Sequence, residues 1–273
     1  MHIRIGFDFI FDVPVPTVML LALYVHPSRQ KDLLGPERIV AEPDVPITDF
    51  IDSFGNKVGR ILAPAGTLRL RHHNVIRDHG EPDVVGWTAE QHNVQDLPTG
   101  VLQYLLSSRY CEVDEMTDLA WNLFGNTPLG WPRVQAVLNW VHNHVTFGYQ
   151  FARSTKTAMD VYNEKQGVCR DFMHLSVTLL RALNIPARYV TGYLGDIGVP
   201  ISPSPMDFSA WFEVYLGGRW WTCDALHNVA RIARVLMATG RDATDVAQTT
   251  SFGSTTLTKF QVTTEEITDG AAF

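Results

Sequence analysis

The sequence has 273 residues, of which 45% are hydrophobic and 19% charged, a composition typical of an ordered globular protein of one or two domains. A formal net charge of −7 argues against a nucleic-acid partner, because nucleic-acid-binding surfaces are normally basic. The three cysteines do not suggest a disulfide framework, so the reducing cytoplasm is the expected location.

No signal peptide or membrane segment is expected. The N-terminus lacks a cationic region followed by a long apolar core and a cleavage site. The longest apolar run, Val18 to Val25, is shorter than the roughly 20 residues that span a bilayer. We therefore expect no membrane partner, and we interpret this run as a buried strand.

Residues 1–90 are predicted to form a β-sandwich-like domain. HIRIGFDFIF alternates, with Ile3, Ile5, Phe7 and Phe9 on one side. Two further strand patterns flank Phe54-Gly55-Asn56, which is typical of a hairpin. Several short strands without a helical period favour a small sandwich or an open barrel.

Helical patterns begin in the next part of the chain. Residues 91–125 are expected to be a linker and helical connection, and residues 126–273 a second domain. A first helical pattern runs from Asp114 to Phe124. A second helix is predicted from Pro132, since proline is favoured at the first helical position. Another is predicted near Thr157, which with Asp160 resembles a capping box.

The fourth predicted helix lies in VCRDFMHLSVTLLRALNIP, and its wide apolar face indicates burial. A strand in ARYVTGYLG follows it, and AWFEVYLGGRWWTCDA then reads as strand, Gly-Gly turn and strand. RIARVLMATG fits either a strand or a helix, whereas TTLTKFQVTT is predicted to be a final strand.

Cys169 stands at the first turn of this fourth helix. The positive end of the helix dipole and the unpaired N–H groups there favour a thiolate over a thiol. Gly167 allows the close backbone approach that a nucleophile turn needs. A structural cysteine at a helix start is the alternative.

The downstream hairpin strengthens the nucleophile interpretation, because a cysteine enzyme needs a base and a group that orients it. Residues 130–228 resemble the transglutaminase-like superfamily, including its bacterial cysteine-protease type. The matching motifs are Phe147-Gly148-Tyr149, GVCRDF, RALNIPARYVTGYLG and AWFEVYLGGRWWTCDA. The resemblance implies a papain-like core, in which Cys169 and Asp224 occupy the nucleophile and aspartate positions.

The sequence departs from this pattern at the histidine position, where Ser209 precedes Ala210-Trp211. A serine hydroxyl is not a general base near neutral pH, and losing a triad member costs orders of magnitude in rate. Three explanations stay open. His227 could replace the base, Ser209 could be an engineered or natural variant, or the site could bind a peptide or amine without turnover.

The remaining candidates are weighed against structural roles. Asp224 could instead cap a turn. Trp211 is the best candidate for a substrate groove, and Tyr149 is a candidate for stabilising an oxyanion beside the Cys169 N–H. His174 is expected to be buried and hydrogen-bonded. No histidine pair has metal-binding spacing, and no nucleotide-binding loop is present, so we expect neither a metal nor a cofactor.

The sequence therefore predicts an α+β protein, with an N-terminal β-sandwich-like domain followed by a papain-like core in which the nucleophile helix packs on an antiparallel sheet. The leading hypothesis is hydrolytic acyl transfer on amide bonds of a peptide or protein, through a thioester at Cys169. The alternatives are a binding protein that has lost the base and a purely structural role. The sequence leaves the oligomeric state open.

Overall fold

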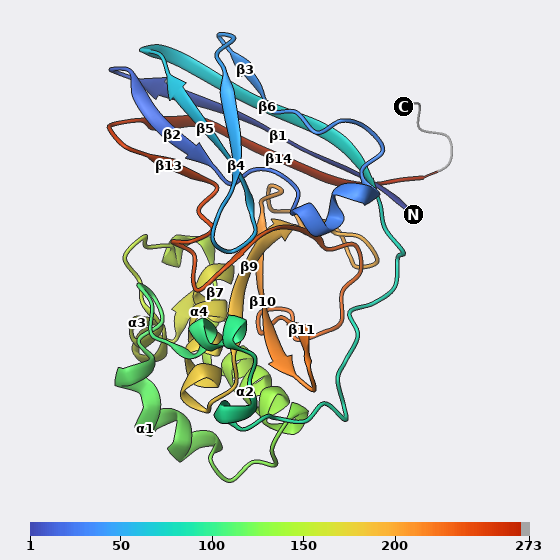
Figure 1. Cartoon of the computed structure of the whole chain (residues 1–273), viewed down its shortest axis with the longest axis vertical. Coiled ribbons are helices and arrows are strands. Elements are labelled where there is room, and N and C mark those ends of the chain that lie inside the picture. The colour runs from blue at the N-terminus through green and yellow to red at the C-terminus, as the bar shows by residue number, and fades with distance from the viewer. Residues whose placement is uncertain (269–273) are drawn as a thin grey trace.

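The computed structural model describes residues 1–268, which form two lobes (Figure 1). One lobe contains two four-stranded antiparallel sheets, and the other packs helices against a third antiparallel sheet. This is the predicted α+β architecture. None of the helices in this part of the chain is long and apolar enough to cross a membrane.

The first lobe is the strand-rich region predicted at the N-terminus. Its sheets have the strand orders β14-β1-β6-β3 and β13-β2-β5-β4. The alternation in β1 is confirmed, since Ile3, Ile5, Phe7 and Phe9 are all buried. The strands are β1 (His2–Val13), β2 (Thr17–Leu21), β3 (Val40–Glu42), β4 (Ile47–Ile51), β5 (Lys57–Ala63), β6 (Gly66–Arg77), β13 (Thr249–Ser251) and β14 (Thr256–Ile267).

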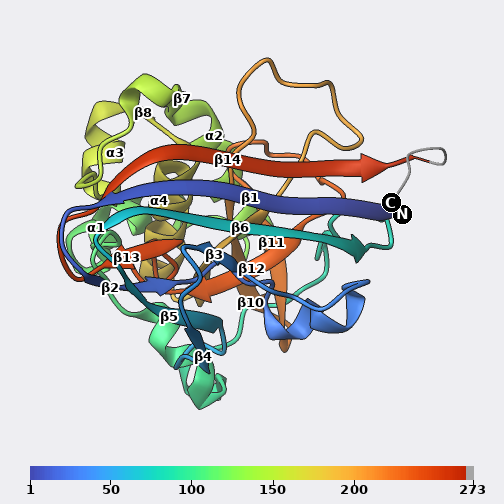
Figure 2. The same cartoon turned by 90° about the horizontal axis from the view of Figure 1, so that it is seen from above.

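The last strands differ from the expected domain division, which assigned residues 126–273 to the core. Strand β14 pairs along β1, with His2 opposite Ile267, and β13 pairs with β2. Figure 2 shows β14, β1 and β6 side by side. The second lobe is therefore inserted into the sandwich, between β6 and β13.

The second lobe contains the long helices. Its sheet has the strand order β11-β10-β9-β12, so RIARVLMATG forms a strand and not a helix. The elements are α1 (Val113–Phe124), α2 (Trp131–His144), α3 (Ala158–Glu164), α4 (Cys169–Ala182), β7 (Thr146–Phe147), β8 (Gln166–Gly167), β9 (Ala187–Tyr193), β10 (Ser209–Leu216), β11 (Arg219–Cys223) and β12 (Val235–Gly240). Four short 3₁₀ helices complete the chain: η1 (Pro27–Asp32), η2 (Val94–Asp96), η3 (Thr99–Leu105) and η4 (Tyr149–Phe151).

Helix α4 lies at the centre of this lobe. Every residue from Asp171 to Ala182 is buried, because α1, α2 and α3 contact the helix together with β9 and β10. The helix ends at Ala182, and two residues later Asn184 has a φ of 62°, the left-handed conformation that commonly follows the end of a helix. A helix held on so many sides gives Cys169, at its start, a fixed position.

The predicted capping box of α3 is confirmed. The Thr157 hydroxyl accepts a hydrogen bond from the Asp160 N–H, and the Asp160 carboxylate accepts one from the Thr157 N–H. Both bonds satisfy N–H groups that the first helical turn leaves without a partner. This start fixes the segment that leads through β8 to Cys169.

Candidate active site

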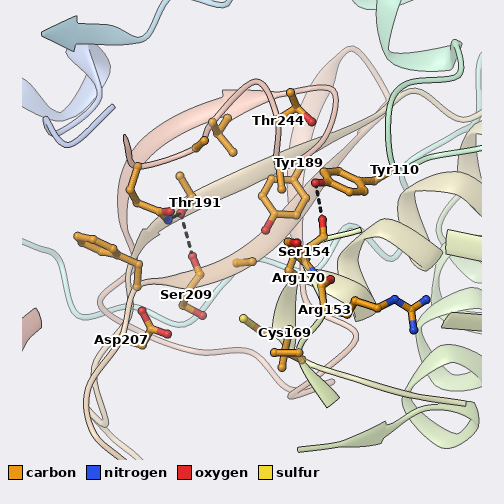
Figure 3. Close-up of a pocket in the computed structure, with 18 of the residues that line it drawn as sticks. Tyr110, Arg153, Ser154, Cys169, Arg170, Tyr189, Thr191, Asp207, Ser209 and Thr244 are labelled. Atoms are coloured by element: carbon orange, nitrogen blue, oxygen red, sulfur yellow. Dashed lines mark hydrogen bonds between the residues drawn. The ribbon is translucent and has the colours of Figure 1, made fainter. Parts of the chain in front are cut away.

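Cys169 is half-buried at the junction of two cavities, one of about 670 Å³ and one of about 320 Å³. Tyr149, Asp207 and Ser209 line both cavities together with Cys169. Figure 3 shows Asp207, Ser209 and Cys169 around one of them. Phe260, from β14 of the first lobe, also lines the larger cavity. A cleft bounded by both lobes therefore passes over the thiol.

The backbone before Cys169 is held in place by hydrogen bonds. Strand β7 pairs in parallel with β8, and the Gly148 N–H donates to the Gly167 carbonyl at 3.1 Å. The Asp171 carboxylate accepts a hydrogen bond from the Val168 N–H at 3.0 Å. A Cβ atom at Gly167 would lie 2.8 Å from Asp171 Oδ2, so glycine is needed for this close approach.

The electrostatics of Cys169 differ from the expectation for a cysteine at a helix start. Burial, followed by the negative charge of Asp207, raises the pKa of the thiol to about 12. Hydrogen bonds from the backbone N–H groups of Arg170 and Ala210 favour the thiolate but do not outweigh these effects. The thiol is therefore protonated near neutral pH in the free protein.

Ser209 is the first residue of β10 and lies beside Cys169, where the family resemblance places a histidine. The two side chains point toward one another in the cleft (Figure 3). The serine carbonyl accepts a hydrogen bond from Thr191 Oγ1 at 3.4 Å, and its backbone is paired with Gly192. These contacts fix the start of β10, but position 209 supplies no imidazole to the sulfur.

Asp224 follows β11 and is buried. Its Oδ2 atom lies 2.8 Å from His227 Nδ1 and 2.9 Å from Arg234 Nη2, and its Oδ1 atom accepts the backbone N–H groups of Leu226 and His227. Burial raises the pKa of this carboxyl, but the His227 hydrogen bond and the Arg234 charge prevail and hold it well below its ordinary value. Asp224 is therefore ionised and serves as an acceptor.

His227 is one-third exposed and lines the smaller cavity together with Cys169. An ionised carboxylate only accepts hydrogen bonds, so the Nδ1 atom of His227 carries the proton that it shares with Asp224. In the neutral ring, Nε2 then has a free lone pair. The structure thus places Cys169 and an imidazole oriented by Asp224 on the lining of one cavity, with Asp224 itself behind the imidazole.

The other candidates have different outcomes. Tyr149 is exposed and lines both cavities, in reach of a substrate. The assignment of Trp211 to a groove is wrong, because this side chain is only 2% exposed and packs in the core, with the Arg234 guanidinium 5.0 Å from its ring centroid. His174 is buried, and its Nε2 accepts the Ala243 N–H at 3.1 Å, as predicted.

Sequence reasoning missed two residues. Arg234, on the way into β12, pairs with both Asp224 and Asp83. Asp207 stands in the cleft two residues before Ser209, and the alternation of an extended chain could have placed both side chains on one face. Nothing in the sequence marked Arg234, since its partner lies ten residues away across a loop.

Comparisons with known proteins agree with this geometry. The model of the transglutaminase-like superfamily matches residues 119–225. An uncharacterized protein of Mycobacterium leprae is 31% identical over 229 residues, which cover 81% of this chain and 80% of that protein.

A crystal structure from Cytophaga hutchinsonii, provisionally assigned as a cysteine protease, superposes with a TM-score of 0.84 at 31% identity. The match covers 100% of this chain and 93% of that one, so it includes both lobes. The protein described here belongs to the transglutaminase-like superfamily.

Proposed function

We propose that this protein is a cysteine-dependent hydrolase of amide bonds in peptides or proteins. The observation that carries the proposal is that His227, oriented by its hydrogen bond to Asp224, lines the same cavity as the Cys169 thiol. A thiol nucleophile, a base and a group that orients the base are the parts that covalent acyl transfer requires. The provisional assignment of the Cytophaga protein as a cysteine protease supports the same reaction class.

In this mechanism the thiol is deprotonated only during attack. His227 Nε2 takes the proton from Cys169 as the sulfur forms a bond to the amide carbon. The C–N bond then breaks, and His227 returns the proton to the leaving amine. Water next attacks the thioester, His227 takes one of its protons, and the carboxylic acid is released with the thiol restored.

The carbonyl oxygen of the substrate gains negative charge as the sulfur attacks, so it needs hydrogen-bond donors. The backbone N–H of Cys169 and the Tyr149 hydroxyl are the proposed donors, because Tyr149 lines both cavities beside the sulfur. The larger cavity, at about 670 Å³, has room for several residues of an extended peptide. A reducing compartment such as the cytoplasm suits the three free cysteines.

A second candidate is a protein that binds a peptide or an amine without turnover. The raised pKa of Cys169 and the serine at position 209 favour it. A peptide mixture incubated with the protein, with and without a small primary amine, tests both candidates by mass spectrometry. Cleaved peptides that disappear with Cys169→Ala support the hydrolase, whereas amine adducts indicate transfer. Intact peptides retained by the protein would favour the binding candidate.

A further inference from the structure

Asp207 is a carboxylate in the cleft that the mechanism above does not use. It is half-buried, lines both cavities, and lies on the Ser209 side of Cys169 (Figure 3). Its charge is the second largest influence on the Cys169 thiol, after burial. The carboxylate therefore stands close to the reacting sulfur.

Asp207 lacks the cationic partner that the buried carboxylates Asp171 and Asp224 of this lobe have. Asp171 pairs with Arg170 at 3.0 Å, and Asp224 pairs with Arg234 at 2.9 Å. Among residues 1–268, no lysine, arginine or histidine forms a salt bridge with Asp207, which accepts a hydrogen bond from the Phe208 N–H. Burial accordingly raises the pKa of this carboxyl.

The surroundings of Asp207 suit an organic cation. Tyr149 and Phe147 line the smaller cavity with their rings edge to face at 5.2 Å, and aromatic faces attract ammonium groups. Burial and then the Asp207 charge raise the pKa of Tyr149, and both residues line the two cavities beside Cys169. In the part of the chain that the structure describes, no group of three acidic, histidine or cysteine side chains could hold a metal ion.

We propose that Asp207 determines specificity by pairing with a primary ammonium group of the substrate, such as a lysine-type side chain next to the bond that is attacked. This inference rests on the proposed function of the same site. A cation in the cleft would neutralise a carboxylate that otherwise lies desolvated, and it would offset the negative charge that opposes thiolate formation at Cys169.

The cation of Arg231 does not fill this role. Its side chain lines the smaller cavity, but its Nη2 atom donates to the Gly195 carbonyl at 2.8 Å. The carboxylates that act on it are Asp224, Asp196 and Asp83. Arg231 is therefore not the cationic partner of Asp207, and a cation of the substrate can take this position.

Binding to the Cys169→Ala protein tests this inference without turnover. The first probe is Nα-acetyl-lysine amide, whose side-chain ammonium is free. The second is the same compound with the side-chain amine acetylated, and both are titrated by NMR. We expect about tenfold tighter binding of the charged probe, and we expect Asp207→Asn to remove the difference. Asp196→Asn is the matched control, because Asp196 lines only the smaller cavity and accepts the Ser202 N–H.

Turnover of matched lysine and norleucine peptides by the protein with Cys169 intact separates the possible failures. Asp207→Asn should lower the ratio of kcat/KM for the lysine peptide to kcat/KM for the norleucine peptide by about tenfold, because only the lysine peptide carries the partner cation. An equal loss for both peptides would mean that Asp207 transfers protons or supports the fold, which overturns the inference. Ammonium-selective binding without turnover would refute the proposed hydrolase alone, and turnover without ammonium preference would refute the specificity role alone.

Discussion

His227 Nδ1 lies 2.8 Å from Asp224 Oδ2, and the two residues are three positions apart in the loop that follows β11. The aspartate thus holds an imidazole from its own loop, although the family pattern places the histidine at the start of β10. Because the same imidazole lines the Cys169 cavity, the proposal that His227 is the relocated base has testable consequences.

Alkylation of Cys169 by iodoacetamide should be slow at pH 7, because the raised pKa leaves only a small fraction of the thiol ionised. The rate should rise about tenfold per pH unit up to pH 9 as this fraction grows. Peptide mapping by mass spectrometry distinguishes this thiol from the buried Cys111 and Cys223. A rate that reaches a plateau below pH 8 would contradict a protonated resting thiol and indicate a thiolate–imidazolium pair.

Replacement of His227 by alanine should lower kcat/KM by about 100-fold, because a positioned general base typically contributes this much or more. The exposed His79 provides the matched control, and His79→Ala should leave the rate unchanged. If His227→Ala retained full activity, the relocated base would be excluded.

Restoring the family residue with Ser209→His should raise the alkylation rate of Cys169 at pH 7 by at least about tenfold, since an adjacent imidazole favours the thiolate. Ser209 lines both cavities, so a larger side chain has space there. Ser209→Ala is the control and should behave like the unsubstituted protein. An unchanged rate in the histidine variant would show that position 209 does not direct its side chain at the sulfur.

The Asp224 carboxylate should stabilise the fold in a pH-dependent way. Its pKa is held below the ordinary value of 3.8, so its stabilisation is present above pH 4 and is lost as the pH falls. Asp224→Asn should cost about 3–5 kcal/mol at pH 7, because it removes one partner of the buried pair with Arg234. Urea unfolding from pH 3 to 7 measures this, and a cost that did not shrink toward pH 3 would contradict the assignment.

Much of the fold could be predicted because it depends on local patterns. Each of three predicted features depends on a stretch of about a dozen residues: the alternation in β1, the capping box of α3 and the apolar face of α4. The pairing of β14 with β1 could not be predicted, because the two strands lie more than 240 residues apart. The residue pattern of a strand does not specify which other strand it pairs with.

The candidate site could likewise be predicted only in part. The motif around Cys169 and the position of Asp224 followed from sequence, as did the missing histidine at Ser209. The indole of Trp211 was misplaced, because alternation gives the face of a strand but not what covers that face. Asp207 has the spacing that places it on the same face as Ser209, but only the folded structure shows that this face lines the cavity of the thiol.

The insertion of the second lobe between β6 and β13 means that no single cut separates the two lobes. A fragment that stops at residue 90 lacks both β13 and β14, which leaves the backbones of β1 and β2 exposed along one edge. Unpaired edges of this kind promote aggregation. The second lobe could instead be excised as one internal piece, and joining β6 to β13 by a short linker would give an uninterrupted sandwich.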